Sequence, residues 1–490
     1  MCGIVGILGT PHAAKEAYQG LLLMQHRGQD AAGILSLDSR GQHYHLHKDA
    51  GLVDRVFDRE ALLGLHGDIA IAHTRYSTVP GQTVTDIQPV MLNYPHGIGL
   101  AHNGHLHNME ALKNHLKNDR NRYLFTDNDG EALLNLIADA LADSDDPDAF
   151  MVSDIARAVR SVFKHAEGGY AVIGTVAKHG FFAFRDPHGI RPLVFGKRDL
   201  TDDEREQTDF DAAWCFASES NTMNYLGYER IRDVQPGEFV FIDLEGNVHS
   251  DRLTHKPAKP CMFEYVYFAN PDSVMDDENV YATRLRMGER LGRQVKTLMD
   301  EGVINPDVVV PVPETSRISA IPLSEVTGVP YRELLIKNRY VQRSFILESQ
   351  DRRENAVRLK LTPVADELRG KNVLLVDDSI VRGTTSRRII EMVRNAGANQ
   401  VYIASASPPI LHPCRYGIAF PKHEELLAHG KTLHEIEAEL GTDRIIYLTQ
   451  DNLERAIGKR SLCSACLDGH YPTNTVSDAP QATSAGAAGD

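Results

Sequence analysis

Residues 376–386 read VDDSIVRGTTS and decide the fold of the second half of the chain. The apolar run before them, NVLLV at 372–376, is typical of a buried parallel strand, and residues 386–396 have the apolar spacing of a helix. A strand that ends in two acids, followed by a turn that opens a helix, places polar groups where α/β sheets bind ligands. A second apolar run, DVVVPV at 307–312, adds another such strand. We therefore predict a doubly wound α/β domain from about residue 261 onwards.

The turn itself predicts a phosphate site. Gly383 lets the backbone approach a ligand closely, and the N–H groups at the start of a helix attract phosphate. Asp377 and Asp378 can hold sugar hydroxyls, either directly or through Mg²⁺. A simple helix cap is the alternative interpretation, but a cap needs neither two acids nor the Gly-Thr-Thr that follows.

The segment between these two strands is basic. Residues 337–360 hold seven Lys or Arg and three acids, whereas the whole chain has a net charge of −15. Such a local excess indicates an anionic ligand, and a solvated surface loop is the alternative. The polar residues around Gln350 suit a mobile lid over that ligand.

The bulk properties limit the class of protein. A chain of 490 residues, 42% hydrophobic and 24% charged, is long enough for two or three globular domains. Its net charge of −15 argues against nucleic-acid binding, which needs an extended basic surface. No apolar run reaches the length of a membrane span and no signal peptide is recognisable, so we expect a cytoplasmic protein without membrane partners. Its six cysteines are then not expected to form structural disulfides.

The first half of the chain begins with MCGIVG, residues 1–6. Removal of Met1 leaves Cys2 with a free α-amine, of ordinary pKa about 7.7–8.0, beside its own thiol. A nucleophile next to a base that works near neutral pH suits acyl transfer. The alternative is a buried structural cysteine, but a chain terminus usually frays unless it is held. The apolar residues 4–8 predict a short strand that holds it.

Three polar motifs follow in the same half. They are QHRGQDAAG at 25–33, HTRYST at 73–78 and AHNG at 101–104. Any one of them alone is typical of a structural loop, since Asn-Gly is a common turn pair and a single Arg is usually solvated. Strand-like runs at 169–174 and 181–184 and a helical pattern at 131–141 predict layers of sheet and helix around them.

Together with Cys2, these motifs resemble those of the class II glutamine amidotransferases. These enzymes are N-terminal nucleophile (Ntn) hydrolases, so the resemblance implies a four-layer αββα domain. It implies that Cys2 Sγ attacks the glutamine amide and that the α-amine of the same residue carries the proton. Asn103 and Gly104 would form the oxyanion hole. Arg75 would bind the α-carboxylate of glutamine and Asp129 its α-ammonium, although relatives usually carry a Ser beside that Asp.

The segment 376–386 resembles the phosphoribosyl pyrophosphate (PRPP) motif of the type I phosphoribosyltransferases. The resemblance implies that PRPP is bound by Asp377, Asp378, Arg382, Gly383, Thr384 and Thr385. In relatives, a hydroxyl residue at the position of Thr315, in the motif PVPETS at 311–316, helps to hold Mg²⁺ with the two acids.

Four other cysteines need a separate explanation. Cys463 and Cys466 form a Cys-x-x-Cys unit, which alone could be a redox pair, half of a zinc site or half of a cluster. Cys261 and Cys414 lie far away in the sequence. Four thiolates suit zinc as well as iron–sulfur, so ligand chemistry leaves the two open.

Both halves in one chain, in this order, resemble the amidophosphoribosyltransferase family from residue 2 to about 473. The resemblance implies that ammonia from glutamine attacks C1 of PRPP and gives 5-phosphoribosylamine, glutamate and pyrophosphate, at the first committed step of de novo purine biosynthesis. One branch of the family binds a [4Fe–4S] cluster through four cysteines in matching motifs, so the resemblance favours iron–sulfur here. It also implies Mg²⁺, feedback inhibition by purine nucleotides and a homo-oligomer.

We expect an amidotransferase domain over 2–255, a phosphoribosyltransferase domain with the cysteine segment over 261–473, and a disordered tail over 474–490. Two other functions are open at this point. One is a different class II amidotransferase, such as one that makes glucosamine phosphate, and the PRPP motif counts against it. The other is a PRPP-sensing regulator without catalysis, which would not need Cys2, Arg75 and Asn103, and all three are present here.

Overall fold

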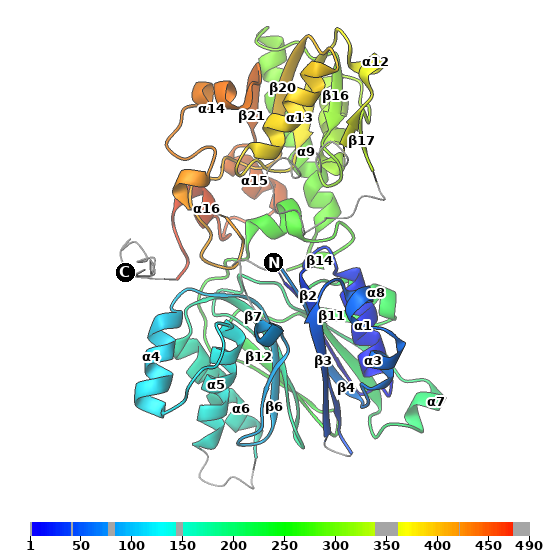
Figure 1. Cartoon of the computed structure of the whole chain (residues 1–490), viewed down its shortest axis with the longest axis vertical. Coiled ribbons are helices and arrows are strands. Elements are labelled where there is room, and N and C mark those ends of the chain that lie inside the picture. Colours follow the sequence, from blue (N-terminus) through cyan, green and yellow to red (C-terminus); the bar gives the residue numbers. More distant parts are fainter. Residues whose placement is uncertain are drawn as a thin grey trace, which may run out of the picture.

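The structure is a computed structural model that describes residues 2–40, 43–76, 84–143, 150–338, 361–420 and 422–473. Figure 1 shows an N-terminal body built on two sheets and a C-terminal body built on a third. Residues 339–360 of the basic segment, the tail from 474, Ser77 and Thr78 lie outside the described residues. Within the described ranges, no helix is long and apolar enough to cross a membrane.

The first sheet is antiparallel and has the start of the chain in its middle. Its strands are, in spatial order, β11 (Glu229–Asp233), β9 (Val194–Asp199), β10 (Ala212–Ala217), β1 (Gly3–Leu8), β4 (Ile69–Arg75), β2 (Ala31–Asp38) and β3 (His43–Ala50). β1 is buried along its whole length, because β10 and β4 pair with its edges and α1 (Ala13–Leu23) packs on it. A strand covered in this way is apolar at every position rather than alternating. The predicted strand at 4–8 is confirmed.

The second sheet is also antiparallel and carries three helices on its outer face (Figure 1). Its strands are β13 (Val248–Arg252), β12 (Glu238–Asp243), β8 (Gly180–Arg185), β7 (Gly168–Val176), β6 (Ile98–Leu106) and β5 (Val90–Leu92). The helices are α4 (Met109–Arg120), α5 (Asp129–Ala142) and α6 (Val152–His165). α5 is buried on most sides, because it packs against β6, α4 and α6. The strands predicted at 169–174 and 181–184 and the helix at 131–141 are confirmed.

The two sheets face each other across one apolar core. A Cβ atom added to Gly6 of β1 would lie 2.4 Å from the Phe181 ring, and one added to Gly99 would lie 2.3 Å from Leu35 Cδ2. Glycine at these positions lets the opposite sheet come close. Helix, sheet, sheet and helix therefore stack in four layers, which confirms the predicted αββα architecture.

The third sheet is parallel and doubly wound, as predicted. Its strands are, in order, β16 (Val308–Pro311), β19 (Asn372–Asp377), β20 (Gln400–Ser405) and β21 (Arg444–Tyr447). Leu374 and Val376 of β19 share a core with α9 (Val280–Asp300), α10 (Arg317–Thr327) and α15 (Gln450–Ile457). Val373 and Leu375 point the other way, towards α13 (Thr384–Asn395) and α14 (Leu433–Leu440). Both faces of the sheet are covered, which is why its strands read as continuous apolar runs.

Short elements complete the description. They are α2 (Val53–Val56), α3 (Arg59–Leu63), α7 (Asp202–Arg205), α8 (Asn221–Leu226), α12 (Ala365–Leu368), α16 (Ala465–Asp468), the 3-10 helices η1 (Val84–Asp86) and η3 (His423–Glu425), the π-helix η2 (Glu264–Phe268), and the strands β14 (Val274–Met275), β15 (Glu278–Asn279), β17 (Leu335–Lys337) and β18 (Leu361–Pro363).

The chain crosses between the two bodies twice. Residues 253–260 join them without helix or strand. The end of the chain then returns, since Cys463 N–H donates to Pro260 O at 2.9 Å and Thr473 Oγ1 lies 2.9 Å from His107 Nε2. The domain boundaries at 255 and 261 stay predictions.

Candidate active sites

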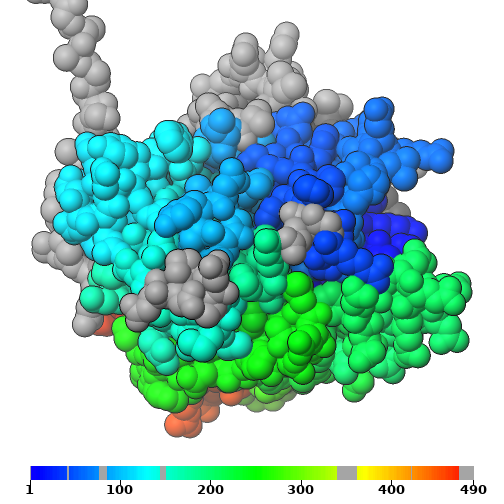
Figure 2. All heavy atoms as spheres, turned by 90° about the horizontal axis from the view of Figure 1, so that it is seen from below, coloured from blue at the N-terminus to red at the C-terminus, as the bar shows by residue number. Residues whose placement is uncertain are grey.

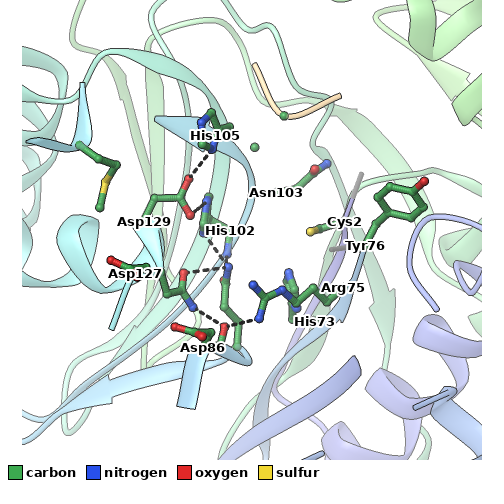
Figure 3. A pocket seen from close by; sticks show the side chains of 15 residues that line it. Cys2, His73, Arg75, Tyr76, Asp86, His102, Asn103, His105, Asp127 and Asp129 are labelled. Atoms are coloured by element: carbon green, nitrogen blue, oxygen red, sulfur yellow. Dashed lines mark hydrogen bonds and ion pairs between the residues drawn. The ribbon is translucent and has the colours of Figure 1, made fainter. Parts of the chain in front are cut away.

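A pocket lies where β1, β4, β6 and the start of α5 meet (Figure 3). Its lining includes all five residues predicted to bind and cleave glutamine: Cys2, Arg75, Asn103, Gly104 and Asp129. Cys2 precedes β1, Arg75 ends β4 and Asp129 begins α5. The remaining two lie side by side on β6. Residues spread over 128 positions are thus brought to one cavity by the ends of regular elements.

Cys2 is fixed although it is the second residue of the chain. Arg27 Nε donates to Cys2 O at 3.1 Å, and the next residue already belongs to the central strand β1. The side chain of Cys2 is partly exposed to the pocket. A terminal residue held in this way presents its thiol in a defined place, as a nucleophile must be presented.

Asn103 has an amide group ready for a ligand. The residue is fully buried, and among the described residues neither Nδ2 nor Oδ1 has a hydrogen-bond partner. Leaving such a group unpaired costs about 1–3 kcal/mol, so its persistence indicates a ligand partner. Gly104 next to it has φ +150°, and a Cβ there would lie 2.1 Å from Gly169 O. Only glycine fits, which fixes the backbone at the predicted oxyanion hole.

The carboxylate of Asp129 is held ionised. Oδ1 lies 3.1 Å from His102 Nε2 and Oδ2 lies 3.5 Å from His105 Nδ1, while Leu106 N–H donates to Oδ2 at 3.1 Å. Burial alone would raise the pKa of Asp129, but the two histidines outweigh it and hold the pKa well below its ordinary range. An ionised carboxylate on the pocket wall suits an α-ammonium group.

Gln88 sets the tautomer of His102. The backbone N–H of His102 donates to Gln88 Oε1 at 2.7 Å, which orients the Gln88 amide and leaves its NH₂ group to face His102 Nδ1 at 2.9 Å. Nδ1 is therefore the acceptor, and Nε2 is the ring nitrogen that carries an N–H towards Asp129. This chain of contacts explains how Asp129 is held in one orientation.

Arg75 and His73 lie together at the other side of the pocket (Figure 3). Arg75 Nη1 donates to Asp86 O at 2.9 Å, which orients a guanidinium group suited to a carboxylate. His73 is fully buried, and burial, followed by the nearby His102 and Arg75, lowers its pKa well below the ordinary value. His73 is therefore neutral, so the positive charge on this side is that of Arg75.

A buried charge network joins this pocket to the C-terminal domain. The Arg27 guanidinium pairs with Glu219 and, at 2.9 Å, with Glu264. Glu264 also lies 3.5 Å from Arg191, whose Nη2 donates to Tyr416 O. Every charged side chain in the network is nearly inaccessible to solvent, so each charge depends on its partners in the network rather than on water.

The predicted PRPP residues lie at the carboxyl edge of the parallel sheet. Asp377 ends β19 and Asp378 follows it, with Ser379 Oγ donating to Asp378 Oδ1 at 2.7 Å. Burial, and then Asp378, raises the pKa of Asp377 well above its ordinary value. Burial raises the pKa of Asp378 to about 6, against hydrogen bonds from Ser379 and from the Thr315 hydroxyl. The buried carboxylate of Asp377, the half-buried carboxylate of Asp378 and a hydroxyl are oxygen ligands of the kind Mg²⁺ prefers, so the residues present fit this cation.

The turn after these acids has the predicted form. Gly383 has φ +71°, caps α13, and would place a Cβ 2.9 Å from Leu427 Cδ2. Thr384 and Thr385 are exposed at the first turn of α13, where backbone N–H groups attract phosphate. Arg382 is exposed and lies 3.2 Å from Glu425. The structure thus brings all seven predicted residues of this site to one edge of the sheet.

The four predicted ligand cysteines converge from three segments. Cys261 and Cys463 form an isolated parallel bridge, and the N–H groups of Leu411 and His412 donate to Cys466 O at 2.9 and 3.0 Å. Burial, followed by Cys414 and Cys261, raises the pKa of the Cys466 thiol well above its ordinary value. Within the described part of the chain, however, no three His, Cys, Asp or Glu side chains form a group that could hold a metal ion as they stand.

Several residues at these sites have no role in the sequence-based prediction. Arg27, Gln88, His102 and Gly417 all contact the glutamine pocket or its nucleophile. Arg27 and His102 belong to the motifs at 25–33 and 101–104, but their partners lie far along the chain. The 237 positions between Arg27 and Glu264 hide that pair from any local pattern.

The two halves of the chain match two family models. Residues 73–223 match the glutamine amidotransferase domain and residues 285–407 match the phosphoribosyl transferase domain. Fold and sites together therefore define a glutamine amidotransferase joined to a phosphoribosyltransferase.

Full-length relatives identify the family. The amidophosphoribosyltransferase of Haemophilus influenzae is 44% identical over 97% of this chain and 94% of its own. Those of Escherichia coli K12 and Saccharomyces cerevisiae are 43% and 42% identical over 93% and 92% of this chain and 88% of theirs. The solved glutamine PRPP amidotransferase of B. subtilis, complexed with ADP and GMP, is 37% identical with a TM-score of 0.84 over 97% of this chain and 98% of its own. The chain belongs to the amidophosphoribosyltransferase family.

Proposed function

We propose that this enzyme hydrolyses glutamine at Cys2 and transfers the ammonia to PRPP, giving 5-phosphoribosylamine, glutamate and pyrophosphate. The family membership supports the overall reaction. The single observation that carries the site assignment is the unpaired, buried Asn103 amide in a pocket shared with Cys2.

The glutamine half-reaction follows from the pocket. After removal of Met1, the Cys2 α-amine takes the thiol proton as Sγ bonds to the amide carbon. Asn103 Nδ2 and Gly104 N–H stabilise the oxyanion. The C–N bond then breaks, the leaving nitrogen takes the proton from the amine, and ammonia departs. Water hydrolyses the Cys2 thioester to release glutamate and restore the thiol.

Substrate orientation is the task of Arg75 and Asp129. Arg75 would hold the α-carboxylate with the donors left over from its bond to Asp86 O. Asp129, kept ionised by His102 and His105, would hold the α-ammonium. These two ends fix the side-chain amide of glutamine over Cys2.

The second half-reaction takes place at the carboxyl edge of the parallel sheet. Asp377 and Asp378 would hold the ribose hydroxyls, and the N–H groups at Thr384 and Thr385 would hold the 5-phosphate. Ammonia bonds to C1 as the bond from C1 to pyrophosphate breaks. Mg²⁺, held with Thr315, would neutralise charge on the leaving pyrophosphate. We propose that the ammonia passes internally, because in neutral water it would be mostly protonated and a poor nucleophile.

Four further assignments are part of the proposal. Purine nucleotides would inhibit, in line with a solved relative complexed with ADP and GMP and another described as the allosteric regulatory enzyme of purine biosynthesis. The protein would be a cytoplasmic homo-oligomer. Cys261, Cys414, Cys463 and Cys466 would hold a [4Fe–4S] cluster, and their convergence in one buried place supports this. The cluster would be structural, since neither half-reaction moves electrons.

The reaction is tested by incubating the pure protein with glutamine, PRPP and Mg²⁺ and measuring glutamate and pyrophosphate. Equal amounts of the two products, with ammonia able to replace glutamine, are expected. Glutamate without PRPP-dependent pyrophosphate would contradict the proposal.

Metal analysis tests the cluster. Protein purified without air should contain about four iron and four sulfide per chain. About one zinc without iron would replace the cluster by a zinc site, and the absence of metal would leave four ordinary thiols.

A further inference from the structure

One wall of the glutamine pocket comes from the other domain. Gly417, which lies between β20 and β21 of the parallel sheet in the sequence, lines the pocket that also contains Cys2 and Asn103. A Cβ added to Gly417 would lie 3.1 Å from both C and O of Gly104, and Gly417 has φ +95°. The backbone of Gly417 therefore packs on the backbone of Gly104, in the segment of β6 that carries the predicted oxyanion donors.

The segment 413–418, here called the strap, is anchored to the N-terminal domain. The fully buried Arg191 donates to Tyr416 O. Tyr416 OH lies 2.8 Å from Thr473 Oγ1, and that hydroxyl lies 2.9 Å from His107 Nε2. A Cβ on Gly169, the residue that crowds Gly104, would lie 3.2 Å from Tyr416 Cβ. The strap therefore packs both on Gly104, which carries a predicted oxyanion donor, and on Gly169, the residue opposite it.

The strap is anchored on its other side to the cysteine segment. Tyr416 N–H contacts Cys414 Sγ at 3.3 Å, and Tyr471 OH donates to Pro413 O at 2.7 Å. The Arg415 guanidinium lies over the Tyr471 ring at 4.0 Å. With both sides anchored, the strap cannot shift without moving either the cysteine segment or the pocket wall.

We propose that the strap is a positioning element for glutamine hydrolysis, in which Gly417 packs on Gly104 and holds the Asn103–Gly104 segment of β6 at the place where the oxyanion forms. The proposal rests on the function assigned to Cys2 and Asn103 above. Gly417 is a positioning residue, because it acts through Gly104 rather than on the reacting atoms. Hydrogen-bond donors to an oxyanion act in the transition state. Displacement of the Asn103–Gly104 segment should therefore lower kcat and leave substrate binding unchanged.

The decisive variant is Gly417→Ala, with Gly430→Ala as its matched control. Both glycines have positive φ, but a Cβ on Gly430 meets nothing within 4 Å, so the control carries the backbone strain without the contact. We expect Gly417→Ala to lower the glutamine-dependent kcat by about 10- to 100-fold, as a small misplacement can. The KM for glutamine and the ammonia-dependent rate should change by less than about twofold. Gly430→Ala should behave as the wild type in all three.

Each outcome decides a separate question. A normal glutamine-dependent kcat in Gly417→Ala, or an equal loss in Gly430→Ala, overturns the strap. Equal loss of the glutamine-dependent and ammonia-dependent rates in a Gly417→Ala protein that is folded would also overturn it, because the strap acts on glutamine hydrolysis alone. If Gly417→Ala does not fold, Tyr416→Phe decides, since it removes only the hydroxyl contact to Thr473: a several-fold lower glutamine-dependent kcat supports the strap and an unchanged one overturns it. The assignment of Cys2 is tested independently by Cys2→Ala. That assignment is wrong if the variant still uses glutamine.

Discussion

The glutamine pocket and the PRPP edge differ in how their charges are balanced before any ligand arrives. In the pocket, the Asp129 carboxylate contacts two histidines and a backbone N–H, and its pKa is held well below the ordinary range. At the PRPP edge, Asp377 and Asp378 are buried next to each other and their pKa values are raised. In the first site the charge of the carboxylate is balanced by neighbouring side chains, whereas in the second burial outweighs the groups that contact the carboxylates.

This difference has a physical consequence for stability. An ionised carboxylate whose pKa is lowered by folding stabilises the folded state, whereas one whose pKa is raised destabilises it at neutral pH. Neutralising an acid should therefore have opposite effects on stability at the two sites. Its effects on activity should also differ, because in the proposed function glutamine is used only in the first site and PRPP only in the second.

The largest expected effect separates the two sites by activity. Cys2→Ala removes the nucleophile and should reduce glutamine-dependent synthesis by about 10⁴-fold or more. Synthesis from high ammonia should stay near the wild-type rate, because it needs only the PRPP site. The matched control is Cys215→Ala, a cysteine buried in β10 beside β1 and away from the pocket. Loss of both activities in Cys2→Ala would show that the two sites are not independent.

Asp377→Asn should affect both nitrogen sources equally. We expect kcat to fall by about 100-fold with glutamine and with ammonia, the order seen when one group that stabilises a transition state is removed. Between the unfolded pKa of about 3.9 and its raised folded pKa, Asp377 binds more protons in the folded state, so its charge lowers the free energy of unfolding at neutral pH. Thermal unfolding of the ligand-free variant with metal chelated should therefore rise by about 2–4 °C. A variant with a lower kcat but an unchanged melting temperature would contradict the argument from charge and would leave the assignment of Asp377 to the PRPP site intact.

Most residues of the two sites can be predicted from the sequence, because both sites lie at the ends of regular elements. The acids after the apolar run 372–376 and the glycine before α13 have local reasons to stand where they do. The opposite charge balance of Asp129 and Asp377 does not follow from the sequence. It depends on His102 facing one carboxylate and on burial of the other, which only the folded chain shows.

Contacts between residues far apart in the chain could not be predicted from the sequence either, and the reason is physical. Gly417 lies three residues after Cys414, which the sequence analysis connects only with metal binding, and its contact with Gly104 joins residues from two domains. The Arg27–Glu264 pair likewise forms only when both domains are folded together. Local periodicity and turn chemistry carry no information about such pairs.

Asp129→Asn should have a smaller effect, opposite in sign on stability. A hydrogen bond to a charged group contributes about 1.5–3 kcal/mol, so the KM for glutamine should rise by about 10- to 100-fold. The charge stabilises the folded state above the unfolded pKa of about 3.9, and that stabilisation is lost as the pH falls, so the variant should unfold about 2–4 °C earlier at pH 7. The matched control is Asp127→Asn, whose carboxylate is exposed and pairs with Lys113. Equal changes of the KM for glutamine and of the melting temperature in the two variants would contradict the role assigned to Asp129.

The smallest expected effect concerns pH and the anchor of the strap. Burial, followed by Arg415 and His105, lowers the pKa of His107 to about 4, whereas an unfolded histidine titrates near 6.5. Between these values the unfolded chain binds the extra proton, so His107 lowers the free energy of unfolding as the pH falls from about 6.5 towards 4. His107→Gln keeps a donor for Thr473 Oγ1 but cannot titrate. Its melting temperature should therefore decline by about 1–2 °C less than that of the wild type between pH 7 and pH 5. His434→Gln, at a side chain that is 94% exposed, should decline in parallel with the wild type. If all three proteins lose stability equally over this range, His107 is not held neutral at the domain junction, and the acid sensitivity of the enzyme must come from other groups.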